Sequence, residues 1–371
     1  MHQKHPKLVR PALGTFARVE YSLVGTTCKR IEGIMQEWLA ILAKDFRCIG
    51  ITSDRGTPTN PFSLQSGSKR LFGPQAHWNE YDDRLTGGPY DLALVNGNHY
   101  PAARQIVFID AKEAGTLERR KEQLTDIAAI VLCPGEQEKP LWLINHLTRL
   151  QILPKWYPFE QLDEVFADLR HNALQSRPPL KALILAGGKS TRMGTDKAQL
   201  QYLKGITEAE RLANVCEELG LEPHLSLRES SNNPAKHLPI VWDRFVGMGP
   251  MGAICSAFLH QPDAAWLVLA CDLPLLEKEH IQRLIEARDS RHYATAVQGK
   301  DRPFPEPLIA IYEPRAYQRL LQFLSLGYAC PRKLLINSDI ATLLFKTELP
   351  LTNANTPEER KFVLDILHGK I

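Results

Sequence analysis

The chain has 371 residues, of which 44% are hydrophobic and 23% are charged, the composition of an ordinary globular protein. This length exceeds one average domain and predicts two. The net charge of +3 is too balanced to favour nucleic acid as a partner, whereas a local basic patch for a phosphorylated small molecule is compatible with it.

Cysteine usage and hydropathy bear on the compartment. The first 16 residues contain no continuous apolar stretch of the kind found in secretory signals. The longest apolar run, residues 264–276, is shorter than the roughly 20 residues of a membrane helix and contains Asp272. The cysteines are odd in number and form no C-x-x-C pair, which predicts reduced thiols (Cys28, Cys48, Cys133, Cys216, Cys255, Cys271 and Cys330). We therefore expect a cytoplasmic protein with no membrane partner.

In the first half, apolar runs alternate with helical periodicity. Helices are predicted over 29–44 and 159–174, and residues 54–90, rich in Gly, Pro, Asn and Ser, predict a long loop or an insertion. Strands are predicted over 17–24, 47–53, 91–97, 105–110 and 126–133. Unbroken apolar strands alternating with helices are typical of a mostly parallel sheet that is covered on both faces.

A domain boundary is predicted at about 175–180. Pro178 and Pro179 cannot continue the preceding helix, and they bias the residue before them towards extended backbone. The predicted domains are therefore 1–175 and 180–371.

The second half repeats this alternation more clearly and predicts a doubly wound, Rossmann-like α/β domain. Its predicted strands are 181–186, 223–228, 238–243, 265–272, 293–298 and 307–313. Its predicted helices are 207–219, 250–259, 277–288, 314–323, 330–336 and 356–368. Ligands of such a domain bind at the carboxyl ends of the strands.

The first of these strands runs into "LAGGKSTRMGTDKA" (185–198). Gly187 and Gly188 allow the backbone to approach a ligand, and Arg192 and Lys197 supply positive charge for phosphates. The spacing differs from the G-x-x-x-x-G-K-[ST] phosphate loop. Taken alone, the segment is equally compatible with a glycine-rich surface turn.

Two acidic residues follow other strands that end at the same edge. Asp243 precedes the glycine-rich "RFVGMGPMGAI", and Asp272 follows a strongly apolar strand, where a carboxylate is suited to hold Mg²⁺ together with substrate phosphates. The alternative for Asp272 is that it caps a helix starting near Pro274.

The ordered motifs "LAGGKSTRMGTDKA", "WDRFVGMGPMGAI", "CDLPLL" and "TNANTPEE" resemble those of the MobA-type nucleotidyltransferases. That resemblance covers 180–371 and implies transfer of GMP from GTP to molybdopterin (Mo-molybdopterin), with Mg²⁺ as cofactor and pyrophosphate as product. It implies these roles: backbone contacts to the nucleotide (Leu185, Ala186, Gly187, Gly188), phosphate contacts (Lys197, Arg192), a place in the nucleotide site (Asp243), Mg²⁺ binding (Asp272) and pterin binding (Asn353, Asn355).

This chain departs from the family pattern at two places. A base-contacting Asn of the family falls near Arg228, and Glu306 stands in a segment that is centred on His-Pro in the family. The resemblance implies in-line attack of a molybdopterin phosphate oxygen on the α-phosphorus, with no protein nucleophile.

The first half more weakly resembles MobB, the GTP-binding accessory protein of the same pathway. At the expected phosphate loop this chain has "SLVGTTCKR" (22–30), and Asn96 replaces the acidic residue of the family's Val-Glu-Gly. Without the glycines and lysine of a phosphate loop, we expect a degenerate P-loop-like domain that acts as a scaffold or docking unit.

Four functional hypotheses stay open. The first is guanylyl transfer; the others are cytidylyl transfer from CTP, a sugar- or polyol-phosphate nucleotidyltransferase, and a non-catalytic nucleotide sensor. Molybdoenzymes and other proteins of molybdenum cofactor biosynthesis are the candidate protein partners.

Overall fold

The computed structural model describes residues 15–52, 64–66, 69–71, 88–136, 138–187, 201–202, 205–228, 233–354 and 356–369. The chain divides into two compact units between Arg177 and Pro178. Arg18–Arg177 forms one unit, and residues 15–17 belong with Pro178–Ile371. In that second unit, Asp263 Oδ1 accepts hydrogen bonds from the backbone N–H groups of Thr15 (2.9 Å) and Ala17 (2.7 Å).

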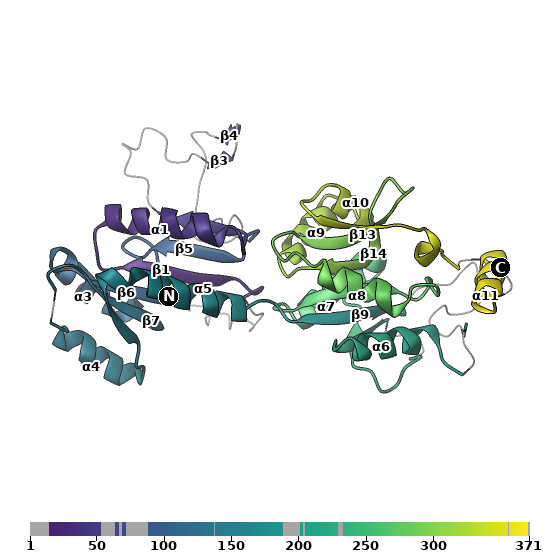
Figure 1. Cartoon of the computed structure of the whole chain (residues 1–371), viewed down its shortest axis with the longest axis horizontal. Coiled ribbons are helices and arrows are strands. Elements are labelled where there is room, and N and C mark those ends of the chain that lie inside the picture. The colour runs from purple at the N-terminus through teal and green to yellow at the C-terminus, as the bar shows by residue number, and fades with distance from the viewer. Residues whose placement is uncertain are drawn as a thin grey trace, which may run out of the picture. The chain divides into compact units, whose positions relative to one another are not determined.

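The Arg18–Arg177 unit is built on a parallel sheet (Figure 1). In spatial order its described strands are β2 (Cys48–Ile51), β5 (Leu92–Asn96), β1 (Val19–Val24), β6 (Arg104–Ile109), β7 (Ile127–Leu132) and β8 (Lys155–Pro158). All of these neighbours pair in parallel. A separate antiparallel pair, β3 (Leu64–Ser66) and β4 (Lys69–Leu71), lies within 54–90, most of which is outside the described residues.

Helices cover both faces of this sheet. α1 (Cys28–Leu42) and α5 (Leu162–Gln175) bury Trp38 and Leu169 on one face, and α3 (Ala114–Arg119) and α4 (Leu141–Leu150) bury Leu117 and Leu143 on the other. Short 3₁₀ turns complete the described part of the unit: Ala111–Glu113, Lys121–Gln123 and Phe159–Gln161.

The second unit contains a mixed sheet. In spatial order its described strands are β11 (Ile240–Trp242), β10 (Pro223–Leu227), β9 (Leu180–Leu185), β12 (Ala265–Ala270), β14 (Glu306–Tyr312), β13 (Ala294–Gly299) and β15 (Ala341–Phe345). β14 runs antiparallel to both of its neighbours, and the other pairs are parallel.

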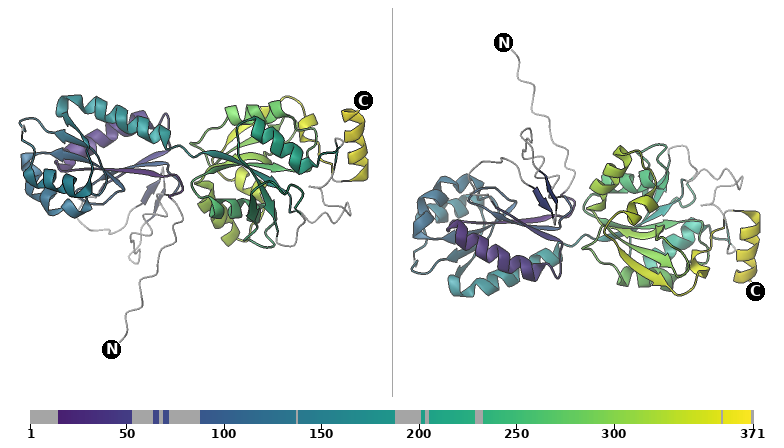
Figure 2. Two further views of the ribbon diagram at one scale, coloured as in Figure 1. Left: turned by 90° about the horizontal axis from the view of Figure 1, so that it is seen from below. Right: turned by 90° about the horizontal axis from the view of Figure 1, so that it is seen from above.

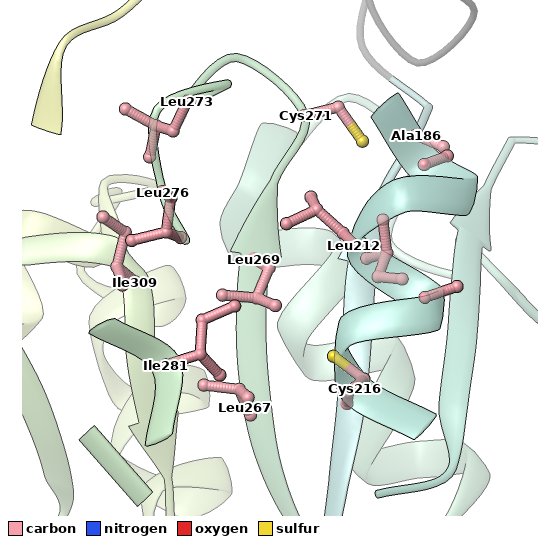
Figure 3. Packing of buried hydrophobic residues seen from close by; sticks show 14 of the residues in the cluster. Ala186, Leu212, Cys216, Leu267, Leu269, Cys271, Leu273, Leu276, Ile281 and Ile309 are labelled. Atoms are coloured by element: carbon pink, nitrogen blue, oxygen red, sulfur yellow. The ribbon is translucent and has the colours of Figure 1, made fainter. Parts of the chain in front are cut away.

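Two hydrophobic layers enclose this sheet, and Figure 2 shows helices on both of its sides. α6 (Glu208–Glu218) and α8 (Lys278–Glu286) pack on one face, where Leu212, Cys216 and Ile281 meet Leu267 and Leu269 (Figure 3). On the other face lie α7 (Gly249–His260), α9 (Ala316–Ser325) and α10 (Pro331–Ile336).

The C-terminal segment leads past the strand ends. A 3₁₀ turn, Leu349–Leu351, precedes α11 (Pro357–Leu367), which packs through Val363 on Tyr202, Leu275 and Ala354. α11 lies beyond the carboxyl ends of the central strands (Figures 1 and 2).

The α/β fold class is confirmed, and the structure contains every strand and helix that the sequence predicted in the second half, with small differences at the ends. Six described strands and helices were not predicted: α3, α4, β3, β4, β8 and the edge strand β15. The sheet of the second unit is mostly parallel, as expected, except at β14. Only residues 300–305 separate it from β13, and such a short connection joins antiparallel strands, because a parallel crossover needs a dozen residues or more.

Candidate active site

Four parallel strands of the second unit end together. Ala270 pairs with Leu185, Leu185 pairs with Ser226, and Leu227 pairs with Trp242. The residues that follow these ends, Ala186–Gly187, Arg228, Asp243 and Asp272, therefore line one edge of the sheet. Three strand spacings separate Asp243 from Asp272, about 14 Å between backbones. The two carboxylates therefore cannot bind one cation together.

The first motif begins in tight contact with the neighbouring strand. The buried Ala186 donates its N–H to the Ser226 carbonyl at 3.1 Å. A Cβ on Gly187 would lie 3.2 Å from the Arg228 backbone nitrogen, closer than most real contacts. A glycine here thus keeps the two strand ends together. The other predicted residues of this motif, Gly188, Arg192 and Lys197, lie outside the described residues.

Asp243 organises the loop that follows β11. Its backbone N–H donates to the Leu227 carbonyl at 2.8 Å, which fixes it beside β10. Its Oδ1 accepts from the Phe245 N–H at 3.0 Å and lies 3.3 Å from the Ser256 hydroxyl on α7. At least one oxygen of this carboxylate therefore holds the loop, so a role in shaping the site accompanies any contact to a ligand. No sequence motif indicated that Ser256 contacts Asp243.

The glycines after Asp243 allow the chain to turn into α7. Gly247 and Gly249 have positive φ angles of 83° and 59°, which disfavour other residues. A Cβ on Gly252 would lie 2.5 Å from the Phe245 carbonyl oxygen. The turn leaves the side chain of Val246 80% exposed beside the strand ends.

Asp272 follows β12 and the buried Cys271. The alternative that it caps the next helix is wrong, because α8 begins at Lys278 and its N-cap is Glu277. The loop carrying Asp272 is fixed from two sides. Arg211 on α6 donates to the Leu276 carbonyl at 3.0 Å, and the Ala354 N–H donates to the Asp272 carbonyl at 3.0 Å.

That second hydrogen bond brings the C-terminal motif to the strand ends. It places Asn353 next to the residue bonded to Asp272, although 80 residues separate the two motifs in sequence. Ala354 is buried and Asn353 is partly exposed, as a ligand-binding side chain requires. Asn355, its predicted companion, is outside the described residues.

Tyr202 is a candidate that the sequence analysis missed. Burial, together with the carboxylates of Glu208 and Asp272, raises the pKa of its hydroxyl to about 12 against the opposing charge of Arg360. Among the described residues nothing hydrogen-bonds to this buried hydroxyl. A neutral donor is thus available close to Asp272. No motif distinguishes it from an ordinary core tyrosine.

The Asp272 carboxylate at this edge of the sheet suits a cation that binds together with the phosphates of a substrate. Within the described part of the chain, no group of three or more His, Cys, Asp or Glu side chains is arranged to hold a metal ion. Mg²⁺ is commonly bound by one or two carboxylates together with substrate phosphates, and Asp272 meets that requirement.

The first unit has a much shorter segment between its first strand, β1, and α1 than the second unit has between β9 and α6. Only Gly25, Thr26 and Thr27 connect β1 to α1, and a Cβ on Gly25 would lie 2.3 Å from the Phe108 carbonyl oxygen. The side chain of Asn98 hydrogen-bonds to the backbone of this turn. Its Oδ1 accepts from the Gly25 N–H at 3.2 Å, and its Nδ2 donates to the Thr26 carbonyl at 2.7 Å. The Gly25 N–H, one donor that could contact a phosphate, thus already has a partner within the protein.

A buried charged cluster closes this turn. Thr26 Oγ1 donates to Asp110 Oδ2 at 2.6 Å, and Arg30 Nη1 lies 2.7 Å from the same oxygen. Burial raises the pKa of the Asp110 carboxyl, but hydrogen bonds from Thr26 and the Lys112 N–H, with the charge of Arg30, lower it overall. The Asp110 charge is therefore neutralised by Arg30 within the protein.

We expect Arg30→Met to lower the free energy of unfolding by about 1–3 kcal/mol, because Asp110 loses its charged hydrogen-bond donor. Urea unfolding of the full chain measures this change. Arg119→Met, which removes an exposed arginine from α3, is the matched control and should change stability little. An equal loss in both variants would contradict the assigned role of Arg30.

None of the helices in the described ranges has the length and apolar character needed to cross a membrane.

Comparisons with known proteins identify the second unit. The MobA-like NTP transferase domain family matches residues 182–340. The "Molybdenum cofactor biosynthesis bifunctional protein" of Synechocystis sp. is 34% identical over 187 residues, which cover 50% of this chain and 53% of that protein. A "Probable molybdenum cofactor guanylyltransferase" of Carboxydothermus hydrogenoformans is 31% identical over 198 residues, which cover 52% of this chain and 98% of that protein.

Among solved structures, the likeness is weaker. "Molybdopterin-guanine dinucleotide biosynthesis protein A" of Archaeoglobus fulgidus superposes with a TM-score of 0.43 at 22% identity, covering 51% of this chain and 99% of that one. This chain spans about half the length of the Synechocystis relative and 66% of the Opitutus terrae relative, a "Probable molybdenum cofactor guanylyltransferase".

The predicted resemblance of the second half is thereby confirmed. Several relatives at 30% identity or more are matched over nearly their whole length. The chain belongs to the MobA-like NTP transferase family.

Proposed function

We propose that the second unit transfers GMP from GTP to molybdopterin (Mo-molybdopterin) and releases pyrophosphate. The relatives named as guanylyltransferases support this reaction. The observation that carries the proposal for this chain is the hydrogen bond from Ala354 to Asp272, which joins the segment of Asn353 to the edge where the nucleotide motifs end.

The reaction requires the attacking oxygen of molybdopterin to lie in line with the bond that breaks in GTP. A phosphate oxygen of molybdopterin attacks the α-phosphorus of GTP and forms a new P–O bond, while the bond from the α-phosphorus to the oxygen bridging to the β-phosphorus breaks. The electron pair leaves with pyrophosphate. No protein nucleophile is needed, so the residues of the chain act by positioning both substrates.

In this proposal the strand ends hold the nucleotide between Ala186–Gly187 and Asp243, with Lys197 and Arg192 on its phosphates. Asp272 would hold Mg²⁺, which supplies charge neutralisation for the departing pyrophosphate. Asn353 and Asn355 would hold the pterin. The separation of Asp243 from Asp272, about 14 Å, suits a ligand as extended as a nucleoside triphosphate.

The nucleobase is the most open part of the proposal. Arg228 follows β10 where the family has a base-contacting Asn, so a cytidylyl transferase using CTP is the second candidate. For the first unit we propose a scaffold role without GTP hydrolysis, supported by the cluster of Thr26, Arg30 and Asp110. The MobB-like assignment, the cytoplasmic location and any molybdoenzyme partner stay predictions.

The test incubates the full chain with molybdopterin, Mg²⁺ and one of GTP, CTP, ATP or UTP, and measures pyrophosphate release. We expect turnover with GTP. Turnover with CTP alone would replace guanylyl by cytidylyl transfer, and no turnover with any nucleotide, under conditions in which a related guanylyltransferase works, would reject the proposed reaction. Hydrolysis of GTP to GDP without acceptor, retained after the second site is inactivated by Asp272→Ala, would reject the scaffold role.

A further inference from the structure

One arginine joins the turn before β14 to the segment that leads to Asn353. Arg302 lies in the turn between β13 and β14, and each nitrogen of its guanidinium group has a different partner. Nη1 lies 2.6 Å from Glu306 Oε1, Nε lies 2.8 Å from Glu348 Oε2, and Nη2 donates to the Leu351 carbonyl at 2.7 Å.

The two carboxylates that hold this guanidinium are themselves fixed. Glu306 Oε2 also accepts from Arg332 on α10 at 2.9 Å. Glu348 Oε1 accepts from the Asp301 N–H at 3.1 Å and occupies the space above Gly299, where a Cβ would lie 2.3 Å from it. Arg302 is therefore held in one position while it donates to Leu351.

The contact with Leu351 lies immediately before the segment of Asn353. Residues 352–354 extend between two anchors: the Leu351 carbonyl, held by Arg302, and the Ala354 N–H, held by the Asp272 carbonyl. Asn353 is between these anchors and is partly exposed. Its position thus depends on Arg302 at one end and on the Asp272 loop at the other.

Glu306 has a structural role in this arrangement. It stands where the family pattern has a histidine before proline, yet its two oxygens are bound by Arg302 and Arg332. A carboxylate bound by two guanidinium groups holds them in place.

We propose that Arg302 is a positioning residue for the acceptor substrate and acts through the Leu351 carbonyl on Asn353; this rests on the proposed function, in which Asn353 contacts the acceptor. The planar fork of arginine is required, because a lysine ammonium cannot direct donors to Glu306, Glu348 and Leu351 at once in this plane. The nucleotide motifs at Gly187 and Asp243 follow other strands, and Arg302 reaches the Asp272 loop indirectly, through residues 351–354.

The test compares Arg302→Lys with wild type in steady-state kinetics. The variant keeps the charge and loses the fork, and small misplacements of a substrate can cost up to about 100-fold in rate. We expect the KM for molybdopterin to rise at least about tenfold, with the KM for the nucleotide unchanged within about twofold. A parallel rise in both KM values, or no change in either, would overturn the proposal.

Arg319→Lys is the matched control. Arg319 also donates to a backbone carbonyl, that of Asn337, at 3.0 Å, and to the Ser338 hydroxyl at 3.3 Å, but these residues lie before β15 and away from Leu351. We expect both of its KM values to equal those of wild type. Thermal unfolding of the two variants separates an effect on the acceptor from a general loss of stability.

Amide hydrogen exchange gives a readout that needs no substrate. Arg302→Lys is expected to speed exchange in peptides that contain residues 351–354, with no change in peptides from α7. Unchanged exchange there would overturn the inference even if guanylyl transfer is demonstrated. Faster exchange in a chain whose wild type transfers no nucleotide would leave Arg302 as the anchor of this segment and reject only its use for the acceptor.

Discussion

Replacement of Asp272 by alanine is expected to lower the rate of pyrophosphate release at least about 100-fold while the fold stays intact. The side chain is partly exposed at the end of β12, and the hydrogen bond from the Ala354 N–H is accepted by the backbone carbonyl of Asp272, which alanine retains. The variant therefore removes a carboxylate without removing that hydrogen bond. A metal ion supplies several kcal/mol of charge stabilisation to such a reaction, which corresponds to about 10²–10³ in rate.

Titration with Mg²⁺ tests whether the lost activity comes from loss of a metal ligand. If Asp272 holds the ion, higher Mg²⁺ should recover part of the activity of Asp272→Asn, whose side chain retains one oxygen ligand. Glu279→Gln, which neutralises an exposed carboxylate on the neighbouring α8, is the control and should keep the wild-type rate. Wild-type activity in Asp272→Ala would mean that the metal assignment is wrong.

Arg288→Met is expected to lower the free energy of unfolding of the second unit by about 3–5 kcal/mol. Arg288 forms a bidentate pair with Glu313, at 2.7 Å from Nε to Oε1 and 2.9 Å from Nη2 to Oε2, and Glu313 is fully buried. Removal of one partner leaves a buried, unpaired charge, which is the costly way to break such a pair. The variant also loses the bond from Arg288 to the Pro178 carbonyl at 3.0 Å, just before β9.

Urea unfolding of the full chain measures the effect, as a fall in the midpoint of the transition of the second unit. The double variant Arg288→Met, Glu313→Leu removes both charges and should recover much of the lost stability, because a buried pair replaced by apolar side chains is often neutral. A single variant that unfolds within about 1 kcal/mol of wild type would show that the Glu313 charge is not left unpaired.

The sequence predicted those parts of the fold that depend on local pattern. β9 and β12 are unbroken apolar runs buried on both faces, and α6 begins at a capping box of Thr207 and Glu210. β15 was missed because it is a short strand of five residues at an edge of the sheet, where its burial alternates. The apolar sequence of β14 reads the same in either direction, so only the short connection from β13 could have indicated that it is antiparallel.

Site residues could be predicted where a motif follows a strand. They could not be predicted where residues far apart in the sequence come into contact. Asp243 and Asp272 could be placed on one edge because parallel strands share their carboxyl ends. No sequence motif indicates that Arg302 donates to the Leu351 carbonyl, or that the Ala354 N–H donates to the Asp272 carbonyl. Both contacts depend on how the last segment returns to the sheet, which only tertiary packing decides.

The short connection between β1 and α1 limits how the first unit could change. A phosphate loop of the G-x-x-x-x-G-K-[ST] type is eight residues long, whereas here Gly25, Thr26 and Thr27 alone separate strand from helix. Point substitutions in these residues cannot create the missing length, so recovery of such a loop would require an insertion together with displacement of Arg30 from Asp110. In evolutionary terms, a phosphate loop of this type cannot arise at this place one substitution at a time.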